Sequence, residues 1–301
     1  MAAVAQRVVG SPIQLSRVML ALVTLASVAL APVALECLTA ARPVGAEELG
    51  YPLAVAASAT GPIYLADRNL PGIWKVEGDK LSLFFQASKK FRTPLNAVRC
   101  LTLDRQGKLL AGDSATRDIY RFDEQGQPVA LTKGQIGIPM SIVVTKAGEL
   151  IVADLELHLI WRVPAEGGKP EMLAAVRAPR GLAIDAQDRI WVVSHGADQV
   201  LRVTLDGKVE TVVQGTPFQF AHQIALDDDG HAYITDGYAK AVWKVSPGAE
   251  PQPLVKDAPL VNPVGIVRRD QWFLVVDPRA KALFHLDSAG KLGLLPLQPA
   301  P

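Results

Sequence analysis

The chain has 301 residues, a formal net charge of +1 at pH 7 and hydrophobic residues at 49% of its positions, which suits a folded protein with a sizeable core. The even balance of charge and the lack of a basic run argue against a nucleic-acid partner. The only cysteines are Cys37 and Cys100.

Residues 1–46 have the layout of a secretory signal peptide. Arg7 and Arg17 precede an uncharged stretch, 18–35, that is rich in Leu, Ala and Val, and small residues at 44 and 46 precede Glu47. The alternative is an uncleaved membrane anchor, for which the stretch is short and is interrupted by Pro32. We therefore expect export to the periplasm or the extracellular space, with membrane contact only if residues 1–46 stay attached.

Cleavage would leave residues 47–301 as the mature domain. Of the charged residues, Arg7, Arg17, Arg42 and Glu36 would be lost, so the net charge would become about −1. Only Cys100 would remain, which excludes an internal disulfide, and its place in a strand-like run predicts a small buried side chain. Stability must then come from hydrophobic packing.

Six segments of this domain share one internal spacing. In each, a short aliphatic run ends in Asp or Ser, which we call the anchor. The anchors are Asp67, Asp113, Asp154, Ser194, Asp236 and Asp277. Seven residues after the anchors stand Trp74, Tyr120, Trp161, Leu201, Trp243 and Phe284, each followed by Lys, Arg or His. The anchors lie 46, 41, 40, 42 and 41 residues apart, and a period near 40 predicts a repeat architecture.

The third unit shows how each repeat is built. Residues 140–144, 149–154, 160–163 and 171–174 read as four strands, with turns at 146–148 and 167–168. The first unit has its own four strands between residues 53 and 86, and the last unit ends with a strand at 291–295. Glycine or another turn residue precedes most anchors by six positions, where a tight hairpin needs a positive φ.

Six four-stranded antiparallel units predict an all-β fold, a six-bladed β-propeller over residues 47–301, because one blade cannot bury both faces alone. The aliphatic residue before each aromatic slot should pack between blades. The basic residue after the slot has the same parity, so a bulge or a snorkelling stem would be needed. The sequence shows no strand exchange between the termini, although residues 48–51 could add a short strand.

These units resemble NHL-repeat propellers. Residues 179–185, Pro-Arg-Gly-Leu-Ala-Ile-Asp, match the first strand of that repeat, and residues 230–236, Gly-His-Ala-Tyr-Ile-Thr-Asp, match its second. The resemblance covers about residues 50 to 296. It implies a fold and not an activity, because this fold hosts unrelated functions.

More distantly, the strand pattern is similar to that of the gluconolactonase and senescence-marker-protein family, which holds a divalent metal in its central funnel. That resemblance implies oxygen ligands in the first-strand positions. In this chain those positions hold Pro52 or Leu53, Arg99, Met140 and Arg180. Two arginines and a methionine do not supply such ligands, so the metal site does not carry over.

The loops after each second strand and before each first strand should share one face, where the central channel opens. We call it the funnel face. The first-strand positions at the channel should carry Arg99, Met140, Arg180 and His222. The loops should add Arg68, Asn69, Arg117, His158, His195, Asp198, Lys240 and Arg279. Arginines here could capture an anionic group, or each could instead pair with a nearby aspartate.

Other features of the funnel face allow two interpretations. An amidating lyase of similar fold holds zinc with three histidines, so His158, His195 and His222 could bind a metal; their unlike positions favour ordinary loop histidines. Phe218 and Phe220 could rim the ligand site or fill the gap between blades, and residues 89–92 form a basic loop on the same rim. The recurring anchor aspartates should accept backbone N–H bonds from nearby loops.

No nucleophile elbow, P-loop or dinucleotide motif is present, and we assign no catalytic residue. The sequence favours a monomeric, exported binding or scaffold module without a cofactor. It would recognise a small ligand, an anionic one among the candidates, or a protein partner. The candidate ligand-binding residues are Arg99, Arg180, His222, His195, Met140 and Phe220. The alternative is a lactonase- or lyase-like hydrolytic enzyme with a rearranged site and a Ca²⁺ or Zn²⁺ ion.

Overall fold

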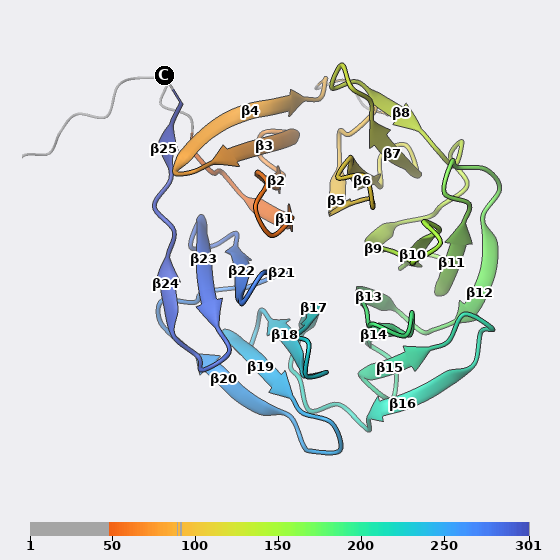
Figure 1. Cartoon of the computed structure of the whole chain (residues 1–301), viewed down its shortest axis with the longest axis vertical. Coiled ribbons are helices and arrows are strands. Elements are labelled where there is room, and N and C mark those ends of the chain that lie inside the picture. The colour runs from red at the N-terminus through yellow and green to blue at the C-terminus, as the bar shows by residue number, and fades with distance from the viewer. Residues whose placement is uncertain (1–47, 89, 91, 301) are drawn as a thin grey trace, which may run out of the picture. The chain divides into compact units, whose positions relative to one another are not determined.

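The computed structural model describes residues 48–300 except residues 89 and 91. The predicted signal peptide therefore lies outside the described residues. Six antiparallel sheets form a ring, each with its strands in chain order from the centre outward (Figure 1). The six-bladed β-propeller is confirmed.

Each blade takes four consecutive strands. Blades 1 and 2 consist of β1 (Pro52–Ala57), β2 (Ile63–Asp67), β3 (Gly72–Glu77), β4 (Lys80–Gln86), β5 (Val98–Leu103), β6 (Leu109–Asp113), β7 (Asp118–Phe122) and β8 (Pro128–Ala130). Blades 3 and 4 consist of β9 (Pro139–Val144), β10 (Leu150–Asp154), β11 (Leu159–Val163), β12 (Glu171–Ala175), β13 (Pro179–Ile184), β14 (Ile190–Ser194), β15 (Val200–Val203) and β16 (Val209–Val213). Blades 5 and 6 consist of β17 (Ala221–Leu226), β18 (Ala232–Asp236), β19 (Ala241–Val245), β20 (Gln252–Lys256), β21 (Gly265–Arg269), β22 (Trp272–Asp277), β23 (Ala282–Asp287) and β24 (Leu292–Leu294).

The core lies between neighbouring blades, as the aliphatic slot predicted. The six slot residues are at most 1% exposed: Ile73, Ile119, Ile160, Val200, Val242 and Leu283. Ile119 of blade 2, for example, shares a hydrophobic cluster with Ile142 and Val152 of blade 3. Each blade thus packs against the apolar faces of its two neighbours. Most of the apolar surface of a propeller is buried at these contacts.

Both devices expected for the basic residue occur. The pairing of the third and fourth strands shifts register at this point in four blades, which is the mark of a bulge. The side chains of Arg121 and Arg162 also reach sideways, and each donates from Nη2 to a carbonyl oxygen of the next blade, that of Ala165 or Leu205. These arginines link adjacent blades while their stems cover apolar surface.

The ring closes in a way that the sequence did not reveal. After β24 the chain crosses to the first blade, where β25 (Gln298–Pro299) pairs in parallel with β4 (Figure 1). Backbone bonds from Gln298 to Asp79 and from Ala300 to Leu81 hold this fifth strand. Residues 48–51 form no strand; Gly50 and Tyr51 instead donate backbone N–H groups to Asp67.

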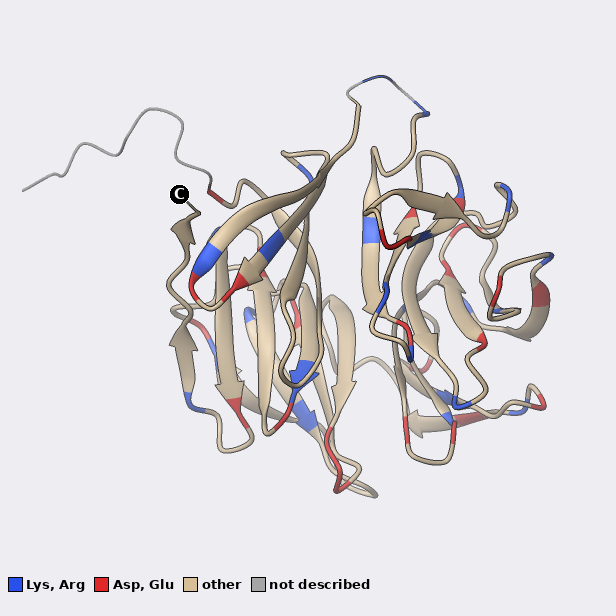
Figure 2. Cartoon of the chain, turned by 45° about the horizontal axis from the view of Figure 1, so that its top comes forward, with Lys and Arg blue, Asp and Glu red and all other residues tan. Residues whose placement is uncertain are grey.

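Charged residues are concentrated in the loops and at strand ends, while most strand surface is uncharged (Figure 2). Within residues 48–300 the described chain contains no helix, and hence none long and apolar enough to cross a membrane.

Candidate functional site

The anchor aspartates build the funnel face. Asp154 is fully buried and accepts backbone N–H bonds from two loops. Gly137 and Ile138 donate from the loop before β9, and Glu156 and Leu157 donate from the loop after β10. The indole N–H of Trp161 adds a fifth bond of 2.9 Å. Equivalent bonds occur at Asp67, Asp113, Asp236 and Asp277. The predicted structural role of the anchors is confirmed.

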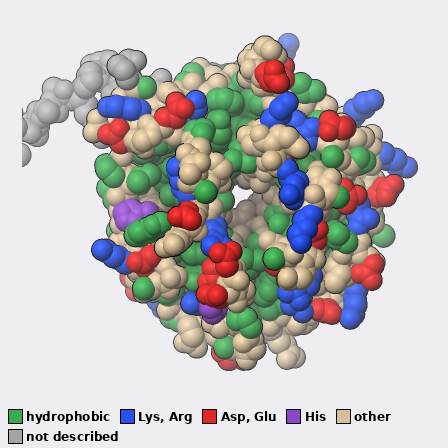
Figure 3. All heavy atoms as spheres, viewed as in Figure 1, with side chains coloured by type: hydrophobic (Ala, Val, Ile, Leu, Met, Phe, Trp, Pro, Cys, Tyr) green, Lys and Arg blue, Asp and Glu red, His purple; other side chains and the backbone are tan. Residues whose placement is uncertain are grey.

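One cavity of about 130 Å³ lies at the centre of the ring. The second residues of all six innermost strands line it: Leu53, Arg99, Met140, Arg180, His222 and Ile266. The common numbering of the blades thus placed four of the predicted residues correctly around one space. In the space-filling view, the blades leave a central opening that Lys and Arg side chains border (Figure 3).

The two arginines of this cavity have no carboxylate partner among the described residues. Arg99 is exposed and donates from Nε to the hydroxyl of Ser114 at 3.0 Å. Arg180 is half-buried, and its Nε is buried without a hydrogen-bond partner in the described chain. Burial lowers the pKa of Arg180, the phenol of Tyr238 raises it, and the charge of Arg99 lowers it further. Since arginine stays protonated in proteins, the cavity is a cationic site without a counterion from the residues that the structure describes.

The histidines of the site are held neutral. Burial, then the charge of Arg180, then His195 lower the pKa of His222 to about 3. Burial and Arg180 also lower the pKa of His195, against a 2.7 Å contact between its Nε2 and the carbonyl oxygen of Ala221. His222 can therefore exchange hydrogen bonds with a ligand near neutral pH without adding charge. The N–H of His195 is already donated to the carbonyl oxygen of Ala221, which leaves only its other ring nitrogen, an acceptor.

We expect His222 to make stability depend on pH. The unfolded chain protonates this imidazole below its ordinary pKa of 6.5, whereas the folded chain does so only near 3, so stability falls as pH drops through that window. Between pH 7 and pH 5 the contribution of His222 to this loss should be on the order of 1 to 2 kcal/mol, so His222→Gln should lose that much less stability than wild type. Urea unfolding at both pH values measures it, with exposed His158→Gln as the control. An equal loss in His222→Gln and wild type would contradict the assignment.

A hydrogen-bonded bridge fixes the cavity wall. Gln223 of β17 donates from Nε2 to the hydroxyl of Ser141 on β9 at 3.1 Å, and that hydroxyl also accepts the N–H of Leu182 on β13. The bridge passes over Gly181, where an added Cβ would lie 2.4 Å from Oε1 and 2.7 Å from Cα of Gln223. Three blades are thereby joined next to Met140, Arg180 and His222. Sequence reasoning missed Gln223, because its role depends on the register of strands from three separate units.

Gly181→Ala should therefore destabilise the propeller by about 1 to 3 kcal/mol, since the methyl group would press on the backbone of β17. Gly196→Ala is the matched control, because its added Cβ meets a serine hydroxyl at 3.0 Å and no backbone atom closer than 3.8 Å. Urea unfolding of both variants gives the comparison. Equal stability of Gly181→Ala and wild type would show that Gly181 is not packed closely against the backbone of β17.

The divalent metal implied by the gluconolactonase resemblance does not fit this cavity. The equivalent positions carry a leucine, two arginines and a methionine, and a hard cation requires oxygen ligands. In the described chain, one group of three side chains is close enough to share an ion: Asp227, Asp229 and His231. It lies in a hairpin on the opposite face, and Asp227 is already bonded to His231 and Tyr233.

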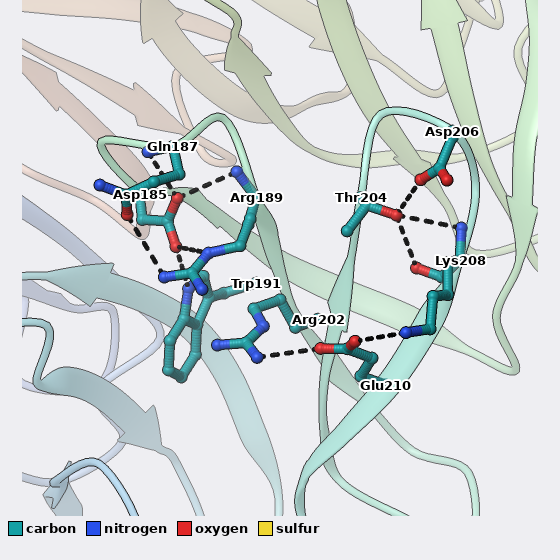
Figure 4. A network of polar contacts seen from close by, with 9 residues as sticks. All are labelled: Asp185, Gln187, Arg189, Trp191, Arg202, Thr204, Asp206, Lys208 and Glu210. Carbon is teal, nitrogen blue, oxygen red and sulfur yellow. Dashed lines mark hydrogen bonds and ion pairs between the residues drawn. The ribbon is translucent and has the colours of Figure 1, made fainter.

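A larger hollow of about 620 Å³ lies on that opposite face, between blades 4 and 5. Its charged side chains are largely paired with one another, and part of the network is drawn in Figure 4. Arg189 contacts Asp185 at 2.7 Å, Arg202 contacts Glu210 at 2.9 Å, and Arg268 contacts Asp228 at 2.6 Å. Because these charges satisfy each other, the hollow offers a ligand less than the smaller central cavity does.

The structure also places other residues that the sequence assigned to the funnel face. Phe218 is buried against Trp243 between blades, whereas Phe220 contacts Arg180 at the rim of the cavity. His158 accepts the N–H of Ala178 as a loop cap, and Arg117 pairs with Glu156 at 2.9 Å. Lys89 and Phe91 of the basic loop lie outside the described residues. Tyr238, which stacks on Phe220, was not predicted.

No family model matches the chain. Peptidyl-glycine alpha-amidating monooxygenase A of Xenopus laevis is 31% identical over 155 residues, which is 46% of this chain and 17% of that protein. The chain thus spans less than a fifth of the curated relatives it matches.

Among solved structures, a gluconolactonase of Xanthomonas campestris superposes with a TM-score of 0.67 and 15% identity over 83% of this chain and 88% of that chain. A virginiamycin B lyase of Staphylococcus aureus gives a TM-score of 0.65 and 16% identity over 85% of this chain and 88% of that chain. The expected resemblance to NHL-type and gluconolactonase-like propellers is confirmed. At such identities it is a likeness of fold, which does not determine activity.

Proposed function

We propose that this chain is an exported propeller module that binds a small anionic ligand at the centre of its funnel face. Arg99 and Arg180 would grip the acid group. The observation that supports this most is that two guanidinium groups line one cavity without a carboxylate partner in the described chain.

Electrostatics favour an anion there. Two like charges that share a small cavity repel each other, and the partly buried Arg180 has also lost much of its hydration. A bound carboxylate or phosphate would relieve both costs, and a guanidinium can donate two parallel hydrogen bonds to such a group. The repeat itself needs no residue of this kind at these positions, because the neighbouring blades carry Leu53 and Met140 there.

The cavity sets the size of the part that enters. Its volume of about 130 Å³ admits an acid group and a few further atoms. The rest of the ligand would extend past His222 toward Phe220 on the rim. Neutral His222 would hydrogen-bond to the ligand, and Met140 would contact its apolar part.

The second candidate is a lactonase- or lyase-like metal-dependent enzyme with a rearranged site. The fold shared with a gluconolactonase and with virginiamycin B lyases favours it. His222 would be its proton acceptor in the cavity, but a pKa of about 3 makes this imidazole a weak base near neutral pH. The lack of oxygen ligands at the equivalent positions counts against a metal in the same place.

Methionine methyl NMR of the full chain separates the two candidates. Of the four methionines, Met140 lines the cavity, while Met172 on the outer strand of blade 3 is 65% exposed and serves as an internal control. Titration with benzoate, succinate and phosphate should shift Met140 and leave Met172 unmoved, with weaker binding at high salt and no effect of a chelator. If none of these anions shifts Met140, the proposal is wrong. Metal-dependent turnover of a lactone that a chelator abolishes would favour the enzyme.

A further inference from the structure

An aromatic stack adjoins the cationic cavity. The guanidinium carbon of Arg180 lies 4.6 Å from the ring centre of Phe220. Tyr238 stacks on Phe220 with ring centres 4.6 Å apart and an angle of 22° between the planes. His195 and His222 contact Phe220 edge-on at 4.7 and 4.9 Å. Phe220 is therefore the centre of a cluster that connects the cavity to the surface.

The outermost ring of this stack is open to solvent. Tyr238 is 62% exposed although it is a large, partly apolar side chain. Its phenol is also near enough to raise the pKa of Arg180, against the effect of burial. An exposed ring beside a cavity offers apolar area and a flat surface to whatever enters that cavity.

Hydrogen bonds within the chain fix the loops that carry the stack of Phe220 and Tyr238. The N–H of Phe220 donates to the anchor Asp236 at 2.9 Å, and the N–H of Ala239 donates to the same oxygen at 3.1 Å. Gly237, next to Tyr238, donates its N–H to the carbonyl oxygen of Phe220 at 3.2 Å. Because one buried carboxylate fixes both loops, binding of a ring on Tyr238 does not carry the entropy cost of ordering them.

Building on the proposed function, we infer that the ligand is an aromatic acid, whose acid group lies between Arg99 and Arg180 and whose flat ring packs on the stack of Phe220 and Tyr238. A plain inorganic anion or an aliphatic acid would use the arginines and leave the exposed tyrosine uncovered. The aromatic ring thus supplies specificity, and the arginines supply the charge recognition.

Benzoate and cyclohexanecarboxylate test this inference as a matched pair. Both are monoanions at pH 7 with seven carbons, and only benzoate has a flat aromatic ring. Titration of the full chain, followed by the Met140 methyl signal, should give benzoate the tighter binding by roughly three- to tenfold. Tyr238→Ala should reduce that preference to within about twofold while cyclohexanecarboxylate binds nearly as before.

Trp272→Ala is the control, because Trp272 is an exposed aromatic residue on the opposite face of blade 6 and should not alter the preference. Equal binding of the two acids by the wild type, or a benzoate preference that survives in Tyr238→Ala, would overturn the inference and leave the proposed function intact. If neither acid, nor succinate or phosphate, shifts Met140, the proposed function itself fails.

Discussion

Asp154→Ala is expected to destabilise the propeller by at least about 3 kcal/mol. The substitution removes one fully buried carboxylate that accepts five hydrogen bonds, four from backbone N–H groups and one from the indole of Trp161. The four backbone donors lie in the loops before β9 and after β10, and most of the five would be left unpaired in the interior. Urea unfolding at pH 7 measures the loss.

Two further variants make this result specific. Asp154→Asn keeps one acceptor oxygen and should lose less stability than Asp154→Ala. Asp123→Ala removes a hairpin aspartate that accepts two N–H bonds near the surface, and should cost about 1 kcal/mol or less. Equal losses at Asp154 and Asp123 would show that the anchors are not the main fastening of the loops.

The same carboxylate should contribute to acid unfolding. Although burial opposes ionisation, the indole of Trp161 and the loop N–H groups hold the pKa of Asp154 below its usual value. A depressed carboxyl pKa stabilises the folded state above the unfolded value, and this contribution is lost as pH falls through the folded value. Wild type should therefore lose more stability on acidification than Asp154→Asn does.

Arg180→Gln should weaken anion binding by roughly 10- to 100-fold, because the ligand would lose charge-assisted hydrogen bonds in a partly buried place. Arg180→Lys should recover part of that loss through its charge, but not the fork or the contact with Phe220. The measurement is the dissociation constant for benzoate at low salt. Arg105→Gln is the control, an exposed arginine at the hairpin of β5 and β6.

Stability provides an independent readout for the same variant. Replacing an arginine that holds the fold together would lower the free energy of unfolding. Arg180, in contrast, has no ion pair in the described chain and carries a partly desolvated charge. Arg180→Gln should therefore unfold at the same or a higher urea concentration than wild type. A variant that loses stability and keeps its affinity would identify Arg180 as a packing residue and contradict the proposed role.

Much of the fold could be predicted because its physical causes are local and repeated. The anchor and the buried aliphatic slot recur at fixed positions of an alternating strand pattern. The sequence alone therefore predicts that Asp154 accepts loop N–H bonds and that Ile160 packs between blades. The same numbering placed Arg99, Met140, Arg180 and His222 around one cavity, since each occupies the second position of an innermost strand.

What the sequence did not reveal depends on contacts between distant units. The closing strand β25 is two residues long and pairs in parallel, so it carries no alternating pattern. The bridge from Gln223 to Ser141 requires the relative register of three blades. Tyr238 follows its anchor in a loop, where no periodicity separates a stacked ring from a solvated one. Phe218 and Phe220 differ in role because one points between blades and the other toward the channel.

The position of a bound anion tests the central claim most directly. Crystals of the full chain grown with 4-bromobenzoate would locate the ligand by the anomalous signal of bromine. We predict the carboxylate between the guanidinium groups of Arg99 and Arg180 and the bromine beside the stack of Phe220 and Tyr238. A bromine signal only in the hollow between blades 4 and 5, or none at the central cavity with the ligand in excess, would contradict the account.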